Sequence, residues 1–246
     1  MIAVLAPSRL ATRWDATRAV TLGLVGGYVD TAGYMMLRGL FPNHVTGNLP
    51  IAAARPGRSA IPLLIMVPLW LAAVIAAAWA AGRIRRRSSA GALPVILGIE
   101  AVLLGLFLVF GVSLVPHRNG PSLVAQTIVG AAGVSAMAVQ SVATRLGGYV
   151  FPTTMVTGTL TLLGMDIADG VFGGRPNDER AAVMRRVQAF RRVVVAFAGG
   201  AALGGLMTAL VHFWAIILPV AAVALCAWGQ AVVDPRSQVS ATSSPR

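Results

Sequence analysis

Residues 26–54 read GGYVDTAGYMMLRGLFPNHVTGNLPIAAA, and the interpretation of the whole fold starts from this stretch. The stretch begins inside an apolar run that contains Asp30, breaks at Phe41-Pro42-Asn43-His44, and restarts as an apolar piece at Val45. Within a lipid bilayer, a carboxylate and a polar break are costly and usually mark a pathway or a binding site. The first question is therefore whether the chain spans a membrane.

The composition favours a membrane protein. Of the 246 residues, 57% are hydrophobic and only 11% are charged, and the mean hydropathy is +0.76. Soluble domains are about half apolar and about a quarter charged. The apolar residues lie in runs of about 20, which is enough to cross about 30 Å of hydrocarbon as a helix. We therefore expect an all-α, polytopic membrane helix bundle with no large soluble domain.

The order of apolar runs predicts six spans and two short pieces. The spans are expected at about 19–37, 61–81, 93–115, 123–143, 193–212 and 214–232, and the short pieces at 45–54 and 156–167. Between them, residues 181–190 have the pattern of an amphipathic surface helix. This organisation predicts a cytoplasmic segment at 1–15, one membrane domain at 16–233 and a disordered cytoplasmic tail at 234–246.

The net charge of +12 arises from arginines, since the chain has no lysine. Basic proteins often bind nucleic acids, but these arginines lie almost wholly between the apolar runs, as topology signals do. With the N-terminus inside, sixteen arginines are cytoplasmic and four are external, namely Arg38, Arg55, Arg58 and Arg118. We expect both termini in the cytoplasm, with the lipid bilayer and its anionic head groups as partners and no nucleic acid.

The polar break recurs later in the chain. Phe41–Leu49 aligns with Phe151–Leu160, with an offset of 110 from residue 41 to 151 and of 111 from residue 46 to 157. Each copy follows a long span and precedes a short piece and two further spans, which defines repeat A at about 16–115 and repeat B at about 121–232. Because three spans are an odd number, the copies enter the membrane in opposite directions. This inverted 3+3 repeat is typical of transporters and channels.

The two short pieces are predicted to be re-entrant half-helices that approach from opposite faces and line a pore or substrate site. Thr46-Gly47 and Thr157-Gly158 stand at their starts, where free backbone N–H groups and a positive dipole end would suit an anion or a polar neutral solute. The alternative is that both pieces are surface amphipathic helices, with the threonines as plain N-caps.

Asp30 is the leading candidate for a functional residue. It lies near the middle of its span between Tyr28 and Tyr34, and its counterpart in the repeat is Gln140. A buried lone carboxylate costs several kcal/mol unless it is paired, hydrated or protonated. Asp30 could couple protons or bind cations, or it could simply hydrogen-bond to the broken backbone nearby. The predicted pathway comprises Asp30, Tyr34, Thr46, Gly47, Asn48, Gln140, Thr157 and Gly158, with His44 and Glu100 as secondary candidates.

The remaining polar residues carry weaker signals. Glu100 could pair with an arginine such as Arg83, and His44 can titrate near neutral pH. A membrane serine hydrolase would need Ser135 and His212 in contact, but these residues are expected at different depths. The sequence has no paired histidines or cysteines for a metal and no phosphate-binding glycine loop. We expect neither an enzyme nor a cofactor.

The opening stretch resembles a known family. Gly27-Tyr-Val-Asp30-Thr-Ala-Gly33-Tyr34, Leu40-Phe41 and Val45-Thr46-Gly47-Asn48 are similar to the signature of the YoaK-like family, bacterial six-span membrane proteins grouped under a domain of unknown function. The resemblance implies a protein of the bacterial inner (plasma) membrane, and it supports the topology and the importance of Asp30 and Thr46-Gly47-Asn48. It supplies no substrate, and His44 lies in a variable part of the pattern.

These observations favour a small-solute permease or channel with its site at the repeat interface, near Asp30 and the Thr-Gly-Asn break. The alternative is a non-transporting membrane scaffold or assembly partner, in which the polar break is structural. Gly23 and Gly27, and likewise Gly200 and Gly204, have the spacing of close helix packing. That spacing leaves open whether the helices pack within one chain or form a homo-oligomer.

Overall fold

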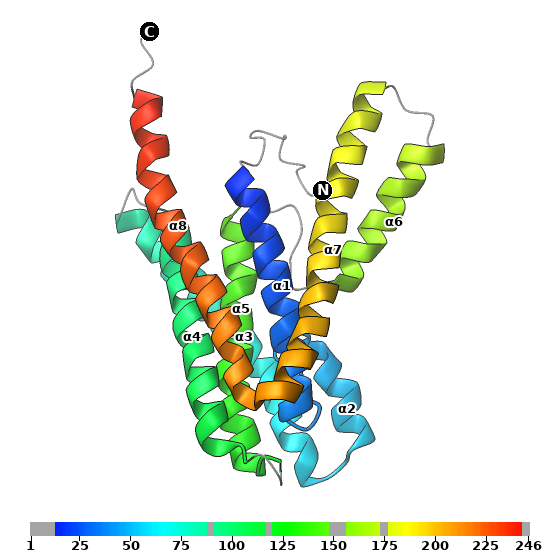
Figure 1. The fold of residues 1–246 in the computed structure, drawn as a ribbon, viewed down its shortest axis with the longest axis vertical. Coiled ribbons are helices and arrows are strands. Elements are labelled where there is room, and N and C mark those ends of the chain that lie inside the picture. Colours follow the sequence, from blue (N-terminus) through cyan, green and yellow to red (C-terminus); the bar gives the residue numbers. More distant parts are fainter. Residues whose placement is uncertain (1–12, 88–90, 117–119, 148–155, 173–176, 243–246) are drawn as a thin grey trace.

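The computed structural model describes residues 13–87, 91–116, 120–147, 156–172 and 177–242, and over these ranges the chain is helical without strands (Figure 1). The helices are α1 (Arg13–Met36), α2 (Asn48–Ala54), α3 (Ile61–Arg87), α4 (Ala92–Leu114), α5 (Leu123–Leu146), α6 (Val156–Phe172), α7 (Asn177–Val211) and α8 (Ile217–Thr242). Short 3-10 helices precede α2 (η1, Val45–Gly47), α3 (η2, Arg58–Ala60) and α8 (η3, His212–Ile216).

Four helical stretches are long and apolar enough to cross a membrane, at residues 58–87, 92–114, 123–146 and 183–232. The last stretch contains most of α7, the turn η3 and the first part of α8, and the chain reverses direction at that turn (Figure 1). α1 is less apolar because Asp30, its tyrosines and its glycines lower its hydropathy. The prediction of an all-helical protein is thus confirmed over the described ranges, and four stretches have the length and apolarity needed to span a membrane.

Two boundaries differ from those expected from the sequence. The surface helix predicted at 181–190 and the span predicted from 193 form one continuous helix, α7. α8 continues to Thr242, whereas a disordered tail was predicted from residue 234. In both places an existing helix is extended. Each added residue gains a backbone hydrogen bond without the cost of starting a new helix, so a polar composition alone does not end the helix.

Glycines bring α1 and α7 into close contact. A Cβ atom on Gly204 would lie 2.6 Å from the carbonyl oxygen of Tyr28, and one on Gly27 would lie even closer to the Phe197 carbonyl oxygen. Without side chains at these positions, the two helix backbones approach directly, as small residues allow in membranes. The glycine spacing seen in the sequence therefore serves packing within one chain.

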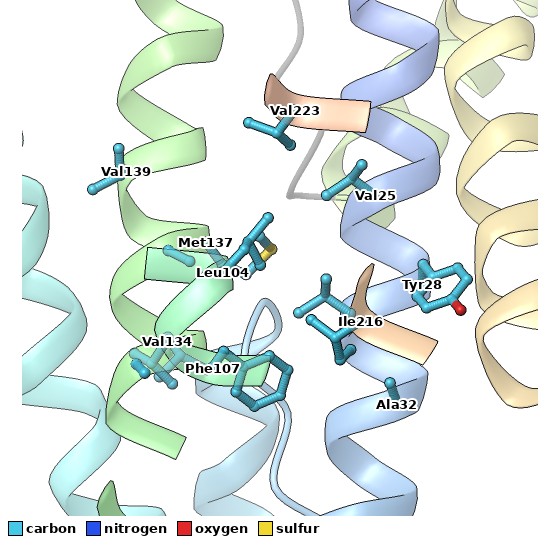
Figure 2. Packing of buried hydrophobic residues seen from close by; sticks show 14 of the residues in the cluster. Val25, Tyr28, Ala32, Leu104, Phe107, Val134, Met137, Val139, Ile216 and Val223 are labelled. Atoms are coloured by element: carbon cyan, nitrogen blue, oxygen red, sulfur yellow. The ribbon is translucent and has the colours of Figure 1, made fainter. Parts of the chain in front are cut away.

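The other helices pack around α1 and α5. α3 and α4 lie against α5, α4 also lies against α8, α2 packs on α3, and α6 packs on α7. Figure 2 shows the core between α1, α4, α5 and α8, filled by side chains such as Val25, Phe107, Met137 and Val223. α2 and α6 lie toward opposite ends of the bundle (Figure 1).

The junction between α7 and α8 is a tight turn, which fits the prediction that one span ends at about residue 212 and the next begins at about residue 214. His212 has the left-handed φ of 57°, and the Tyr28 hydroxyl of α1 donates to the Ala215 carbonyl oxygen at 2.9 Å. Phe213 is fully buried against Gly111 of α4, where any Cβ would overlap its ring. The turn is thereby fixed to both α1 and α4.

Candidate functional site

The candidate site starts where α1 ends. The Gly39 N–H donates to the Tyr34 carbonyl oxygen at 2.9 Å, while Arg38 and Gly39 have φ values of 51° and 84°. This is the usual left-handed closure of a helix C-terminus. Beyond it the chain turns back along α1, because Pro42 packs so closely on Gly33 that a Cβ there would lie 2.5 Å from Pro42 Cδ.

Asp30 holds the returning chain. Its Oδ1 accepts the backbone N–H of Asn43 at 2.7 Å and that of His44 at 3.2 Å, and its Oδ2 is hydrogen-bonded to His44 Nδ1. The carboxylate is only 4% exposed, so these donors replace the water it has lost. Asp30 lies six residues before Met36, about 9 Å up the helix, so the break re-enters alongside α1.

Asn48 closes the break from the other side. This side chain is fully buried; its Oδ1 accepts from the Phe41 N–H at 2.8 Å, and its Nδ2 donates to the Phe41 carbonyl oxygen at 3.0 Å. The Asn48 amide thereby satisfies the backbone N–H and carbonyl groups of Phe41, which lies outside any helix. The Phe41 ring stacks on Tyr34 at a centroid distance of 4.9 Å and covers Gly47.

Two amide side chains meet over Gly26. Gln140 of α5 donates from Nε2 to the Leu22 carbonyl oxygen at 2.9 Å. A Cβ on Gly26 would lie 3.2 Å from Asn43 Nδ2 and 3.5 Å from Gln140 Nε2, so both amides pack closely on this glycine. Asp30 and its repeat counterpart Gln140 therefore border the same small region, between α1, α5 and the break.

Asn43 is the residue that the sequence analysis missed. It is 3% exposed, and neither its side-chain oxygen nor its nitrogen has a hydrogen-bond partner among the described residues. Such groups are rare in proteins, because burying an unpaired amide costs about 1–3 kcal/mol. The only signal in the sequence was its place in the break, since an isolated asparagine in a loop is usually a turn residue.

His44 is the more accessible member of this group. Its side chain is 34% exposed, and its ring meets the Phe197 ring of α7 edge-on at a centroid distance of 5.5 Å. His44 belongs to the segment that connects α1 to η1. The hydrogen bond to the Asp30 carboxylate raises the pKa of His44, burial opposes that rise, and the Asp30 charge adds to it. The pair can therefore hold a proton between a buried carboxylate and a partly exposed ring.

The other predicted residues are less closely grouped. Thr46 is exposed, and no side chain caps the starts of η1 and α2, so Thr46 is not the N-cap that was considered. In the second copy, Gly158 is exposed and a Cβ there would meet nothing within 4 Å. Residues 151–154 and the Thr157 side chain lie outside what the structure describes.

A second polar region surrounds Glu100 of α4. Glu100 is fully buried, and neither carboxylate oxygen has a hydrogen-bond partner within the described part of the chain. The buried Cys226 thiol of α8 lies within electrostatic reach of Glu100 and Arg18. The expected pairing of Glu100 with Arg83 was wrong, because the Arg83 guanidinium instead lies over the Trp79 ring at 4.9 Å. A nearby aromatic face is an alternative partner for an arginine at a helix end.

The chemistry available at the break is hydrogen bonding and proton exchange. Asp30 and His44 form one titratable pair, and the Asn43 and Gln140 amides offer neutral donors and acceptors beside it. Across the described ranges, no group of three or more His, Cys, Asp or Glu side chains could hold a metal ion.

The comparisons with known proteins identify a family without assigning an activity. The family model described as "Protein of unknown function (DUF1275)" matches residues 18–229, which covers both polar regions and all but the ends of the helical bundle. Comparison with curated proteins and with solved structures found no match. The resemblance of residues 26–48 to the YoaK-like family is consistent with this assignment. The chain belongs to the DUF1275 family of proteins of unknown function.

Proposed function

We propose that this protein is a small-solute permease or channel, with its site where the break meets α1 and α5. The observation that carries the proposal is the buried amide of Asn43, which has no hydrogen-bond partner among the described residues and lies beside Gln140. A polar solute or a water molecule passing this point would supply the missing hydrogen bonds. The proposal assigns the protein no enzymatic step and no cofactor.

The packing of the helices supports six spans arranged as an inverted repeat. The sequence offset relates α1 to α5 and α2 to α6, and the order of helices along the chain then pairs α3 with α7 and α4 with α8. Under this relation the α1–α7 contact corresponds to α5–α3, the α2–α3 contact to α6–α7, and the α4–α5 contact to α8–α1, and all six contacts are present. The break would then lie at the interface of the two repeats, where transporters of this kind bind their solutes.

The arginine distribution supports an orientation with both termini in the cytoplasm of a bacterial inner membrane. In that orientation the break and α2 face the outside. A reporter fused after Ser88, between α3 and α4, is expected to give a cytoplasmic signal. An external signal would overturn the orientation.

The Asp30–His44 pair supports coupling of transport to protons. His44 is partly exposed and hydrogen-bonded to a buried carboxylate, so a proton can move between the site and its surroundings through the ring. We expect Asp30→Asn to lower the rate of transport or remove its pH dependence.

Transport is tested by screening small polar solutes and anions for uptake into liposomes that contain the purified protein. Asn43→Leu should abolish uptake and leave folding nearly intact, because the amide makes no hydrogen bond that the change could break. Thr127→Val is the matched control, since it removes a hydroxyl of α5 that bonds only to its own helix at Leu123. Uptake that survives Asn43→Leu, Asp30→Asn and Thr46→Val alike would contradict the proposal.

A second candidate function is a non-transporting scaffold or assembly partner. It is favoured by the hydrogen bonds of Asp30 and Asn48, most of which go to the backbone of the break. If no solute crosses liposomes that contain the wild-type protein, and Asp30→Asn changes only stability, the scaffold interpretation is the better one.

A further inference from the structure

A cavity of about 370 Å³ lies beside the C-terminal end of α1, apart from the buried amides of the break. It is lined by Tyr34, Arg38, Gly39, Arg55, Ser59 and Gln126. We propose that this cavity binds an oxyanion, namely a phosphate, sulfate or carboxylate group, between the guanidinium groups of Arg38 and Arg55. This inference goes beyond the proposed transport function and does not depend on it.

Both arginine side chains are fixed by backbone carbonyls. Arg38 Nε donates to the Pro121 carbonyl oxygen at 2.9 Å, and Arg55 Nη1 donates to the Arg38 carbonyl oxygen at 2.7 Å. Each bond uses one of the five N–H groups that a guanidinium carries. The arginines are therefore oriented in advance while most of their donors stay available to a ligand, which lowers the entropic cost of binding.

The positive charge in the cavity is uncompensated. Over the described ranges, neither Arg38 nor Arg55 forms an ion pair, and the described lining contains no Asp or Glu. A concave surface with charge of one sign concentrates the electrostatic field and attracts counter-ions. Guanidinium groups also match the geometry of oxyanions, because two parallel N–H donors can bind two oxygens at once.

The backbone at this point gives independent support. Arg38 has a φ of 51°, in a position where helices usually have glycine. The next residue, Gly39, has a φ of 84°, and a Cβ on it would lie 3.4 Å from Arg55 Nη1. Glycine at position 39 thus leaves space for the Arg55 side chain. Position 38 is an arginine, although the backbone conformation there favours glycine. The hydrogen bond from Arg38 Nε to the Pro121 carbonyl oxygen offsets part of that strain.

The anion could come from solution or from a lipid head group, since both present the same phosphate chemistry. Two measurements separate these sources. Inorganic phosphate and sulfate are titrated into delipidated protein in detergent while thermal unfolding is followed. Native mass spectrometry then counts the lipids retained from nanodiscs of phosphatidylglycerol or phosphatidylcholine. Protection by inorganic phosphate identifies a site for a free anion, whereas retention of phosphatidylglycerol alone identifies a lipid phosphate. The absence of both effects would overturn the proposal.

The variants test the two arginines separately. Arg38→Gly and Arg55→Gln should each weaken binding about tenfold or more, since each removes a charge-assisted contact worth at least about 1.4 kcal/mol. Arg38→Gly is expected to fold well, because glycine adopts the required φ freely. Arg58→Gln is the matched control: it removes the same charge three residues further on, outside the cavity lining, and should change affinity less than about twofold. Equal affinity in Arg38→Gly and wild type would refute the site. If Arg55→Gln does not fold, Arg55→Lys takes its place. Lysine keeps the positive charge but lacks the paired N–H donors of the guanidinium, so this variant should bind the anion several-fold more weakly than wild type.

Discussion

Asp30 and Glu100 are both carboxylates buried in the helical bundle, and their surroundings differ completely. Asp30 accepts hydrogen bonds from two backbone N–H groups and from the His44 ring. Glu100 is more deeply buried, and its oxygens have no hydrogen-bond partner among the described residues. An ionised carboxylate in apolar surroundings is stable only when donors replace its hydration, so the two residues must act differently.

The comparison shows that burial alone does not identify a functional carboxylate. Asp30 organises the break: it determines where the chain re-enters and positions Asn43 and His44 beside α5 and α7. In the proposed transport site, Asp30 would contribute through the residues that it positions as much as through its own charge. Glu100 organises no such segment, and no donor among the described residues replaces the water that an ionised carboxylate there would lose.

The largest expected effect is the loss of Asp30. Asp30→Ala should destabilise the protein by about 3–5 kcal/mol, because it leaves the buried N–H of Asn43 and the N–H of His44 without an acceptor. Thermal and denaturant-induced unfolding in detergent would measure the change. A loss below about 1 kcal/mol would mean that water replaces the carboxylate, and the break would then be less firmly fixed than its contacts indicate.

Asn48→Ala should have the next largest effect. It removes both hydrogen bonds to the Phe41 backbone within a fully buried site, at a cost of about 2 kcal/mol. Leu49→Ala is a suitable control, since Leu49 is the next residue and is exposed. Similar destabilisation by the two substitutions would show that the Asn48 amide is not what closes the break.

The sequence predicted the helical architecture well, because apolar runs of membrane length carry a strong signal. It also singled out the stretch that forms the candidate site: Asp30, Asn48 and Gln140 lie at or beside the break. These predictions rested on the cost of polar groups in an apolar run. That cost is a local property, so it can be recognised without the fold.

The roles of individual side chains could not be predicted, because they depend on contacts distant in sequence. Gln140 bonds to Leu22, and Tyr28 bonds to Ala215, across separations that no local pattern encodes. Asn43 looked like an ordinary loop residue until the fold buried its amide. The cavity proposed to bind an anion likewise joins residues of the α1 terminus to Arg55 and to Gln126 of α5. The sequence had indicated only that Arg38 and Arg55 lie on the external side of the membrane.

Glu100 should respond in the opposite direction from Asp30. Glu100→Leu is expected to leave stability unchanged or to raise it by about 1 kcal/mol, since replacing an unpaired buried polar group by an apolar one of similar size removes a desolvation cost. The same unfolding assays apply, with Glu100→Gln as the control that keeps a polar group. Destabilisation by more than about 1 kcal/mol would reveal a partner for the carboxyl group in the membrane, and the contrast with Asp30 would then disappear.

The smallest expected effect is a pH dependence that belongs to the Asp30 region alone. The hydrogen bond to Asp30 raises the pKa of His44 in the folded protein, so folding favours the protonated ring. The resulting stabilisation is complete below the pKa of His44 in the unfolded chain and is lost as the pH rises through the higher folded pKa. Unfolding midpoints measured across neutral pH should therefore fall as the pH increases, by a small amount because the ring is partly exposed.

His44→Gln should flatten this profile, whereas Glu100→Leu should preserve it. A pH profile that persists in His44→Gln would show that another group titrates, and the Asp30–His44 pair could then no longer be the coupling element of the break.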